Sequence, residues 1–313
     1  MVQATLVLVK DGSADSAARR VPVWRAWVLA SRPKTLPAAA APVIVGSAAA
    51  FAASQFRPGP ACACLVGALL LQVGANFVND YADFVRGADT VGRLGPMRVT
   101  QAGLLRPRQV LAGTWIVFGL ATLAGVYLAA VAGWPVVAIG VASIAAAWAY
   151  TAGPFPLGYH GLGELFVFVF FGLAAVCGTF YVQAGTLTEG AVFAAVPIGL
   201  LAVAILAVNN LRDIATDRAA GKRTLAARFG TRFARGEFIA LVGVAFAVPV
   251  AASTTGLAPK WVLLSLLALP AAAGVCLVVA RESGRSLNRA LAITGGLELA
   301  FAVLYSVGLI LGR

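Results

Sequence analysis

The feature that most constrains this chain is a run of 55 residues, Gln109 to Gly163, that contains no Asp, Glu, Lys or Arg. A transmembrane helix needs only about 20 consecutive apolar residues, so this run is long enough for two. Of the 313 residues, 60% are hydrophobic and 12% are charged, whereas roughly a quarter of the residues of a soluble domain are charged. The composition therefore excludes a soluble or disordered chain and predicts one integral membrane domain.

Uncharged gaps of this kind predict an all-α protein with nine transmembrane helices. The expected spans are Thr35–Phe56, Pro58–Asn79, Gln109–Val131, Trp134–Thr151, Leu165–Gln183, Ala191–Leu211, Phe238–Thr254, Trp261–Ala280 and Ala290–Leu311. Gly133 and Pro135 are expected to separate the third and fourth helices with a tight turn. Residues 1–34 are expected to form a short cytoplasmic N-terminal arm, and residues 35–313 the transmembrane domain.

The distribution of Lys and Arg predicts which side of the membrane each loop faces. With the N-terminus inside, only three of the 24 basic residues, Arg57, Lys260 and Arg313, fall outside, which leaves 21 on the inner side. This asymmetry follows the positive-inside rule. We therefore expect a multi-pass protein of the cytoplasmic (inner) membrane with both long polar loops in the cytoplasm. Because the net charge of +12 comes from these loop clusters, it does not indicate a nucleic-acid partner.

Two polar motifs follow the second and the sixth expected span. Each contains three oxygen-bearing side chains at helical spacing. These are Asn76, Asp80 and Asp83 in the first motif and Asn209, Asp213 and Asp217 in the second. An even number of spans lies between the motifs, so both lie on the cytoplasmic side. We expect a repeated helix–loop unit that places two acidic patches over one cavity.

The two motifs predict a metal-bridged diphosphate site. Carboxylates this close repel one another unless a cation lies between them, and hard oxygen ligands suit Mg²⁺, which leaves positions for water and phosphate. All six motif side chains are expected to bind Mg²⁺. The residues expected to act in catalysis are Asp80, Asp83, Asp213, Asp217 and Arg98. The residues expected to bind the diphosphate are Lys222, Arg223, Asn76 and Asn209.

A family resemblance supports this interpretation. The stretches NDYADFVRGAD and NNLRDIATDRAAGKRT resemble the two aspartate motifs of the UbiA-type intramembrane aromatic prenyltransferases. The segments Gly95–Leu105 and Tyr150–Gly185 resemble the 1,4-dihydroxy-2-naphthoate branch of that family. The similarity covers nearly everything after Ser31. The first motif departs from the commonest family form in placing Asp89 six residues after Asp83, which leaves the role of Asp89 open.

The resemblance implies a UbiA-like bundle of nine helices around a central cavity that opens sideways to lipid. It implies Mg²⁺-dependent transfer of a polyprenyl group from polyprenyl diphosphate to 1,4-dihydroxy-2-naphthoate. Loss of CO₂ and diphosphate would give demethylmenaquinone, an intermediate of menaquinone biosynthesis. Aromatic residues near the cavity are candidates for binding the prenyl group or the aromatic substrate and shielding an allylic cation. They are Trp148, Tyr150, Phe155 and Tyr159.

Several alternatives remain open from the sequence. Mixed charges that only solvate cytoplasmic loops are the simplest, and interfacial placement is the alternative for the aromatic residues. A 4-hydroxybenzoate or haem-farnesylating relative is possible within the family. A cation-coupled transporter is the alternative outside it, although transporter sites lie near the bilayer midplane and the six predicted ligands lie at span ends. The roles of His160 and Glu164 stay open: the histidine could transfer a proton but is more often structural, and the glutamate could orient the aromatic ring or cap the fifth helix. The prenyl length and the oligomeric state are not predicted.

Overall fold

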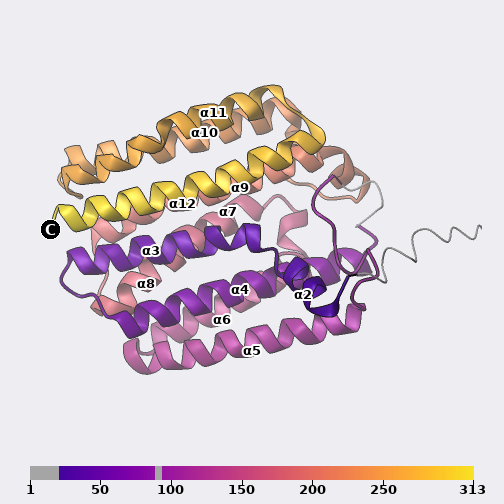
Figure 1. Ribbon diagram of the computed structural model, residues 1–313, viewed down its shortest axis with the longest axis horizontal. Coiled ribbons are helices and arrows are strands. Elements are labelled where there is room, and N and C mark those ends of the chain that lie inside the picture. Colours follow the sequence, from indigo (N-terminus) through magenta and orange to yellow (C-terminus); the bar gives the residue numbers. More distant parts are fainter. Residues whose placement is uncertain (1–20, 89–93) are drawn as a thin grey trace, which may run out of the picture.

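The computed structural model describes residues 21–88 and 94–313, and this part of the chain contains helices and no β-strands. The helices lie side by side along one direction (Figure 1). In chain order they are α2 (Val23–Ser31), α3 (Leu36–Ala52), α4 (Pro58–Val85), α5 (Pro107–Ala132), α6 (Trp134–Ala149), α7 (Gly163–Val167), α8 (Ala175–Ala184), α9 (Glu189–Ala219), α10 (Leu225–Thr254), α11 (Leu269–Arg281) and α12 (Leu287–Leu311). A π-helical segment, Phe168–Ala174, joins α7 to α8, and a 3₁₀ helix, Lys260–Ala268, leads into α11.

Each of the nine expected spans is matched by a helical segment of the described residues. Eight segments are long and apolar enough to cross a membrane, and the ninth, α6, is a shorter apolar helix of 16 residues. The predicted turn is also present, because α5 ends at Ala132 and α6 begins at Trp134. Gly133 between them has a φ of 81°, which glycine adopts without strain. The prediction of an all-α membrane protein is confirmed, and its nine spans are close to the eight long apolar helices and one shorter one of the described residues.

The two acidic motifs lie on the helices themselves. α4 continues past its expected end at Asn79 to Val85, and α9 continues past Leu211 to Ala219. A charged side chain does not end a helix, because the backbone hydrogen bonds continue once the helix has left the apolar layer. The motif residues are therefore fixed in orientation by the helices that carry them.

The main hydrophobic core lies where α3, α9, α10 and α12 meet. Figure 1 shows α10 and α11 at one edge of the bundle and α5 at the opposite edge. Small residues permit close backbone contact between helices, as is common in membrane proteins. In the π-helical segment, a Cβ added to Gly172 would lie only 2.7 Å from the Cα of Gly199 in α9.

Part of the expected N-terminal arm packs against the bundle. α2 buries Ala26, and the Trp27 ring lies 5.4 Å from the ring of Phe77 in α4, measured between centroids. After α2, Arg32 adopts a left-handed backbone conformation with φ 50° and turns the chain towards α3. Residues 1–20 of the arm lie outside the described part of the chain.

Candidate active site

A cavity of about 670 Å³ lies between α3, α4, α5, α6, α8 and α9. Along α4 its lining extends from Cys64 to Asp83, which at 1.5 Å per residue corresponds to about 28 Å, close to the thickness of the hydrocarbon core. The lining is apolar over most of this length and polar where α4 and α9 leave their spans. The expected central cavity is therefore present, with a long apolar part and one polar end.

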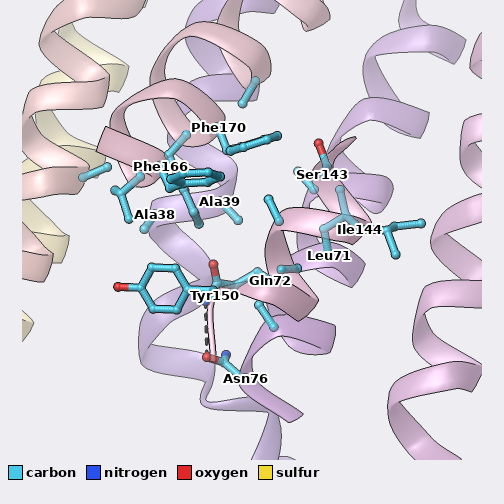
Figure 2. A pocket seen from close by; sticks show the side chains of 18 of the residues that line it. Ala38, Ala39, Leu71, Gln72, Asn76, Ser143, Ile144, Tyr150, Phe166 and Phe170 are labelled. Atoms are coloured by element: carbon cyan, nitrogen blue, oxygen red, sulfur yellow. Dashed lines mark hydrogen bonds between the residues drawn. The ribbon is translucent and has the colours of Figure 1, made fainter. Parts of the chain in front are cut away.

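The cavity-facing side of α4 carries four polar residues at intervals of one helical turn. They are Gln72, Asn76, Asn79 and Asp83. Their spacing of four, three and four residues keeps them on one face of the helix. Figure 2 shows Gln72 and Asn76 in this stripe, joined by a hydrogen bond of 3.4 Å. Asn76 and Asp83 belong to the predicted set, whereas Gln72 and Asn79 were missed.

Asp83 is contacted by three connecting segments of the bundle. Its carboxylate accepts a hydrogen bond of 2.8 Å from the Tyr159 hydroxyl. It also forms ion pairs with Arg98 at 3.1 Å and with Lys222 at 3.2 Å. Arg98 follows α4, Tyr159 follows α6 and Lys222 follows α9. The structure thus brings basic residues from the segments after both motifs to a single carboxylate.

The opposite wall of the polar end is formed by α9. Its cavity-lining polar residues are Asn209, Asn210, Asp213, Thr216 and Asp217. The buried guanidinium of Arg212 donates to both carboxylate oxygens of Asp213, at 2.8 and 2.5 Å, and to Oδ1 of Asn209 at 2.7 Å. Because guanidinium donors have a fixed geometry, Arg212 holds these two predicted ligands in one arrangement.

Asp80 does not line the cavity, in contrast to the prediction that it binds the metal. Its carboxylate accepts hydrogen bonds from the backbone amides of Val99, at 3.1 Å, and Thr100, at 3.0 Å, and from the Thr100 hydroxyl. Only 1% of the Asp80 surface is exposed. One residue along a helix corresponds to a rotation of about 100°, so Asp80 points away from the stripe that contains Asn79. Both of its oxygens hold the loop that carries Arg98.

The structure brings eight of the ten predicted site residues to the cavity. They are Asn76, Asp83, Asn209, Asp213, Asp217, Arg98, Lys222 and Tyr150. Besides Asp80, the exception is Arg223, whose side chain is exposed and whose backbone amide donates to the Tyr159 carbonyl at 2.7 Å. Asp89 lies outside the described residues. Gln72 and Asn79 could have been found from the sequence, because Gln72 lies four residues before Asn76 and Asn79 four residues before Asp83. Residues at this spacing share one face of a helix.

The polar end fits a cation that is bound together with phosphate. Among the described residues, no three His, Cys, Asp or Glu side chains are close enough to hold a metal ion by themselves. Mg²⁺ does not need such a cage, because it is usually bound by one or two carboxylates together with phosphate oxygens and water. Asp83, Asp213 and Asp217 line the polar end and can supply these carboxylates.

Aromatic side chains line the cavity next to its polar end. Figure 2 shows Tyr150, Phe166 and Phe170 around the pocket, which Ala38 and Ala39 of α3 also line. The Tyr150 hydroxyl can donate a hydrogen bond to a group bound in the cavity.

Other residues considered from the sequence do not themselves line the cavity. Trp148 stacks on a tryptophan of α5 with ring centroids 5.1 Å apart, and Phe155 stacks on His160 at 3.7 Å. Glu164 accepts a hydrogen bond of 2.9 Å from the Asn210 side chain. These contacts favour structural roles for His160 and Glu164, whereas Trp148 and Phe155 are not placed to shield a cation in the cavity.

These observations define a class of protein: an α-helical membrane protein whose central cavity has an apolar part and a polar end lined by carboxylates and basic side chains. The sequence of residues 39–311 matches the UbiA prenyltransferase family. The chain belongs to this family, which confirms the resemblance found in the two aspartate motifs.

Relatives and a solved structure agree with this membership. A 1,4-dihydroxy-2-naphthoate octaprenyltransferase of Mycobacterium tuberculosis is 40% identical over 288 residues, which cover 92% of this chain and 97% of that protein. An enzyme of the same name from Haemophilus influenzae is 37% identical, covering 91% and 96% of the two chains. A UbiA homolog from Archaeoglobus fulgidus, solved with GPP and Mg²⁺, has the same fold with a TM-score of 0.66 at 15% identity, covering 91% of this chain and 99% of its own.

Proposed function

We propose that this protein transfers a polyprenyl group from polyprenyl diphosphate to 1,4-dihydroxy-2-naphthoate within the membrane, with loss of CO₂ and diphosphate. The observation that carries the proposal is the division of a cavity that extends about 28 Å along α4 into a polar end and an apolar remainder. A diphosphate head with an isoprenoid tail has the same division. The names of the relatives from M. tuberculosis and H. influenzae support the choice of acceptor.

The polar end stabilises the diphosphate as it leaves. Asp83, Asp213 and Asp217 would hold Mg²⁺, with amide oxygens of Asn76 and Asn209 nearby. When bound, Mg²⁺ supplies positive charge to the diphosphate oxygens. The Mg²⁺ and GPP present in the A. fulgidus homolog support this part of the proposal.

Arg98 and Lys222 add charge-assisted hydrogen bonds to the same diphosphate oxygens. Both side chains already lie at the polar end, within 3.2 Å of the Asp83 carboxylate. Fixed donors of this kind stabilise the negative charge that develops on a leaving group. Asp80 contributes indirectly, because it holds the loop from which Arg98 extends.

The aromatic part of the cavity receives the prenyl carbon that loses the diphosphate. Tyr150, Phe166 and Phe170 line this part, and their aromatic rings would stabilise positive charge and exclude water. The C–O bond to the diphosphate breaks and a C–C bond forms between the prenyl carbon and the electron-rich ring. The bond to the carboxylate breaks and CO₂ leaves, so the overall change requires no net gain or loss of a proton. The product is a hydroquinone, and two-electron oxidation by a separate acceptor gives demethylmenaquinone.

We place the polar end on the cytoplasmic side of the bacterial inner membrane. The support is the charge asymmetry, since three of the 24 basic residues lie on the other side and 21 on this one. The soluble naphthoate then reaches the site from the cytoplasm, and the polyprenyl chain reaches it from the lipid bilayer.

The test is an assay of the purified full-length protein with Mg²⁺, a polyprenyl diphosphate and either 1,4-dihydroxy-2-naphthoate or 4-hydroxybenzoate. We expect release of CO₂ and diphosphate with the naphthoate, and a rate at least tenfold lower with the benzoate. A tenfold ratio corresponds to about 1.4 kcal/mol, which the larger apolar area of the bicyclic ring can supply at about 25 cal/mol per Å². Asp83→Asn serves as the inactive control. Equal rates, or a prenylated product that retains its carboxylate, would favour the benzoate branch instead.

A further inference from the structure

The last helix, α12, reaches the polar end of the cavity through the side chain of Asn288. α12 packs against α9 and α3 (Figure 1). Asn288 is its second residue and is half-buried. Leu291, one turn further along the same face, lines the cavity. Asn288 therefore lies on the side of α12 that faces the cavity, although it belongs to neither acidic motif.

The side-chain oxygen of Asn288 accepts a hydrogen bond from the buried guanidinium of Arg212. The distance from Nη1 of Arg212 to Oδ1 of Asn288 is 2.8 Å. The other nitrogens of the same guanidinium, Nε and Nη2, donate to Asp213 and Asn209, and both of these residues line the cavity. Because the guanidinium is planar and rigid, the acceptor on Nη1 also fixes the direction of the donors on Nε and Nη2.

The side-chain nitrogen of Asn288 has a partner in the loop that follows α4. It donates to the Leu94 carbonyl at 2.9 Å. Leu94 precedes Arg98 by four residues, and Arg98 pairs with Asp83 across the cavity end. Asn288 therefore joins the loop that carries Arg98 to the guanidinium that holds the ligands of the second motif.

These two contacts require an amide side chain at position 288. A guanidinium only donates hydrogen bonds and a carbonyl oxygen only accepts them, so the side chain between them must accept on one side and donate on the other. Asn288→Asp would lose the donor, and Asn288→Leu would lose both groups. The amide is also uncharged, so it completes the hydrogen bonds of Arg212 without competing for its ion pair with Asp213 at 2.5 Å.

We propose that Asn288 is a positioning residue of the metal–diphosphate site. It sets the orientation of Arg212, and thereby the arrangement in which Asp213 and Asn209 bind the cation. This assignment rests on the proposed function. The contact with Leu94 fixes the amide of Asn288, so the same side chain also keeps the loop of Arg98 beside α9. Asn288 does not itself line the cavity, and it acts through Arg212.

The test measures binding of geranyl diphosphate to the full-length protein in lipid nanodiscs, with and without Mg²⁺. The ratio of the two dissociation constants is the gain in affinity that Mg²⁺ supplies. We expect Asn288→Ala to lower this gain at least fivefold and to change the dissociation constant without Mg²⁺ less than twofold. General damage to the bundle would instead weaken binding under both conditions. Arg289→Ala, an exposed change at the next position of α12, is the control and should keep the wild-type gain.

A second background tests whether Asn288 acts through Arg212. Arg212→Lys keeps the charge and removes the planar set of donors, so it should itself lower the gain from Mg²⁺. In this background Asn288→Ala should change the gain less than twofold, because two residues that act through one another do not have additive effects. A further fivefold loss in the double variant would overturn the assignment, as would an unchanged gain in Asn288→Ala alone.

Two comparisons complete the experiment. Asn288→Gln keeps both amide groups on a side chain that is one methylene longer. It should fold even if Asn288→Ala does not, and its gain should lie between those of Asn288→Ala and the wild type. If Mg²⁺ gives the wild type no gain in affinity for geranyl diphosphate, the metal site of the proposed function fails. If the wild type shows the gain and both Asn288 variants retain it in full, only the role of Asn288 fails.

Discussion

Replacing Asp80 by Ala should open the loop that follows α4. The Asp80 carboxylate accepts two backbone hydrogen bonds, from Val99 and Thr100, and both donors are buried. A buried donor without a partner costs about 1–3 kcal/mol, so the two together cost about 4 kcal/mol. The loop can relieve this cost by opening. Because each 1.4 kcal/mol is a factor of ten, we expect the amides of residues 98–105 to exchange with solvent deuterium roughly a thousandfold faster.

The activity of Asp80→Ala should fall for the same reason, since Arg98 would no longer be held 3.1 Å from Asp83. Asp83→Ala is the matched control. It removes a carboxylate that faces the cavity but leaves the hydrogen bonds between Asp80 and the loop amides intact. Hydrogen exchange of residues 98–105 should therefore change less than tenfold, while activity is lost. If Asp80→Ala loses activity while hydrogen exchange in this loop stays at the wild-type rate, Asp80 does not act by holding the loop. It would then contact the metal or the substrate directly.

Three further outcomes are expected. Gly172→Ala should destabilise the bundle by about 1–3 kcal/mol, because its Cβ would lie 2.7 Å from an α9 backbone atom. Thermal unfolding measures this change, and the control Gly119→Ala, whose Cβ would meet nothing within 4 Å, should show no loss of stability. Lys222→Met should raise the KM for polyprenyl diphosphate at least tenfold and leave the naphthoate KM nearly unchanged, which steady-state kinetics would decide. In a variant without its native cysteines, a cysteine at Arg228 should react with an impermeant reagent only from the cytoplasm and one at Lys260 only from outside; the opposite labelling would contradict the topology.

The spans could be predicted because the bilayer imposes one strong requirement, about 20 apolar residues for each crossing. Helix ends were less predictable, since gaps in charge stop at the first ionisable residue and helices do not. α10 begins at Leu225, 13 residues before the expected Phe238, and a kink at Gly230, with a φ of 84°, divides its first turns from the rest. These first turns lie among basic residues, so the gaps in charge could not predict them. A helix in that position is stabilised by packing and by the interface, and hydropathy does not report either.

Spacing alone gave the correct helix face for part of the site only. Asn76, Asp80 and Asp83 at i, i+4 and i+7 form one face, but Gln72, Asn76, Asn79 and Asp83 form another that overlaps it. Which of the two faces the cavity depends on how the loop after α4 folds back. That loop is held by its backbone amides, which every residue carries, so no side-chain pattern could reveal it.

The ion pairs of Asp83 also predict how the two ligands of the polar end affect one another. In this structure Arg98 and Lys222 neutralise the Asp83 carboxylate. A diphosphate that draws these basic groups away leaves Asp83 available to a cation, and a cation that reaches Asp83 releases the same basic groups to the diphosphate. Each ligand therefore lowers the cost of binding the other, and this coupling is reciprocal by thermodynamic linkage. Calorimetric titration should show at least tenfold tighter Mg²⁺ binding when a polyprenyl diphosphate is present, and equal affinities with and without it would contradict the role given to Asp83.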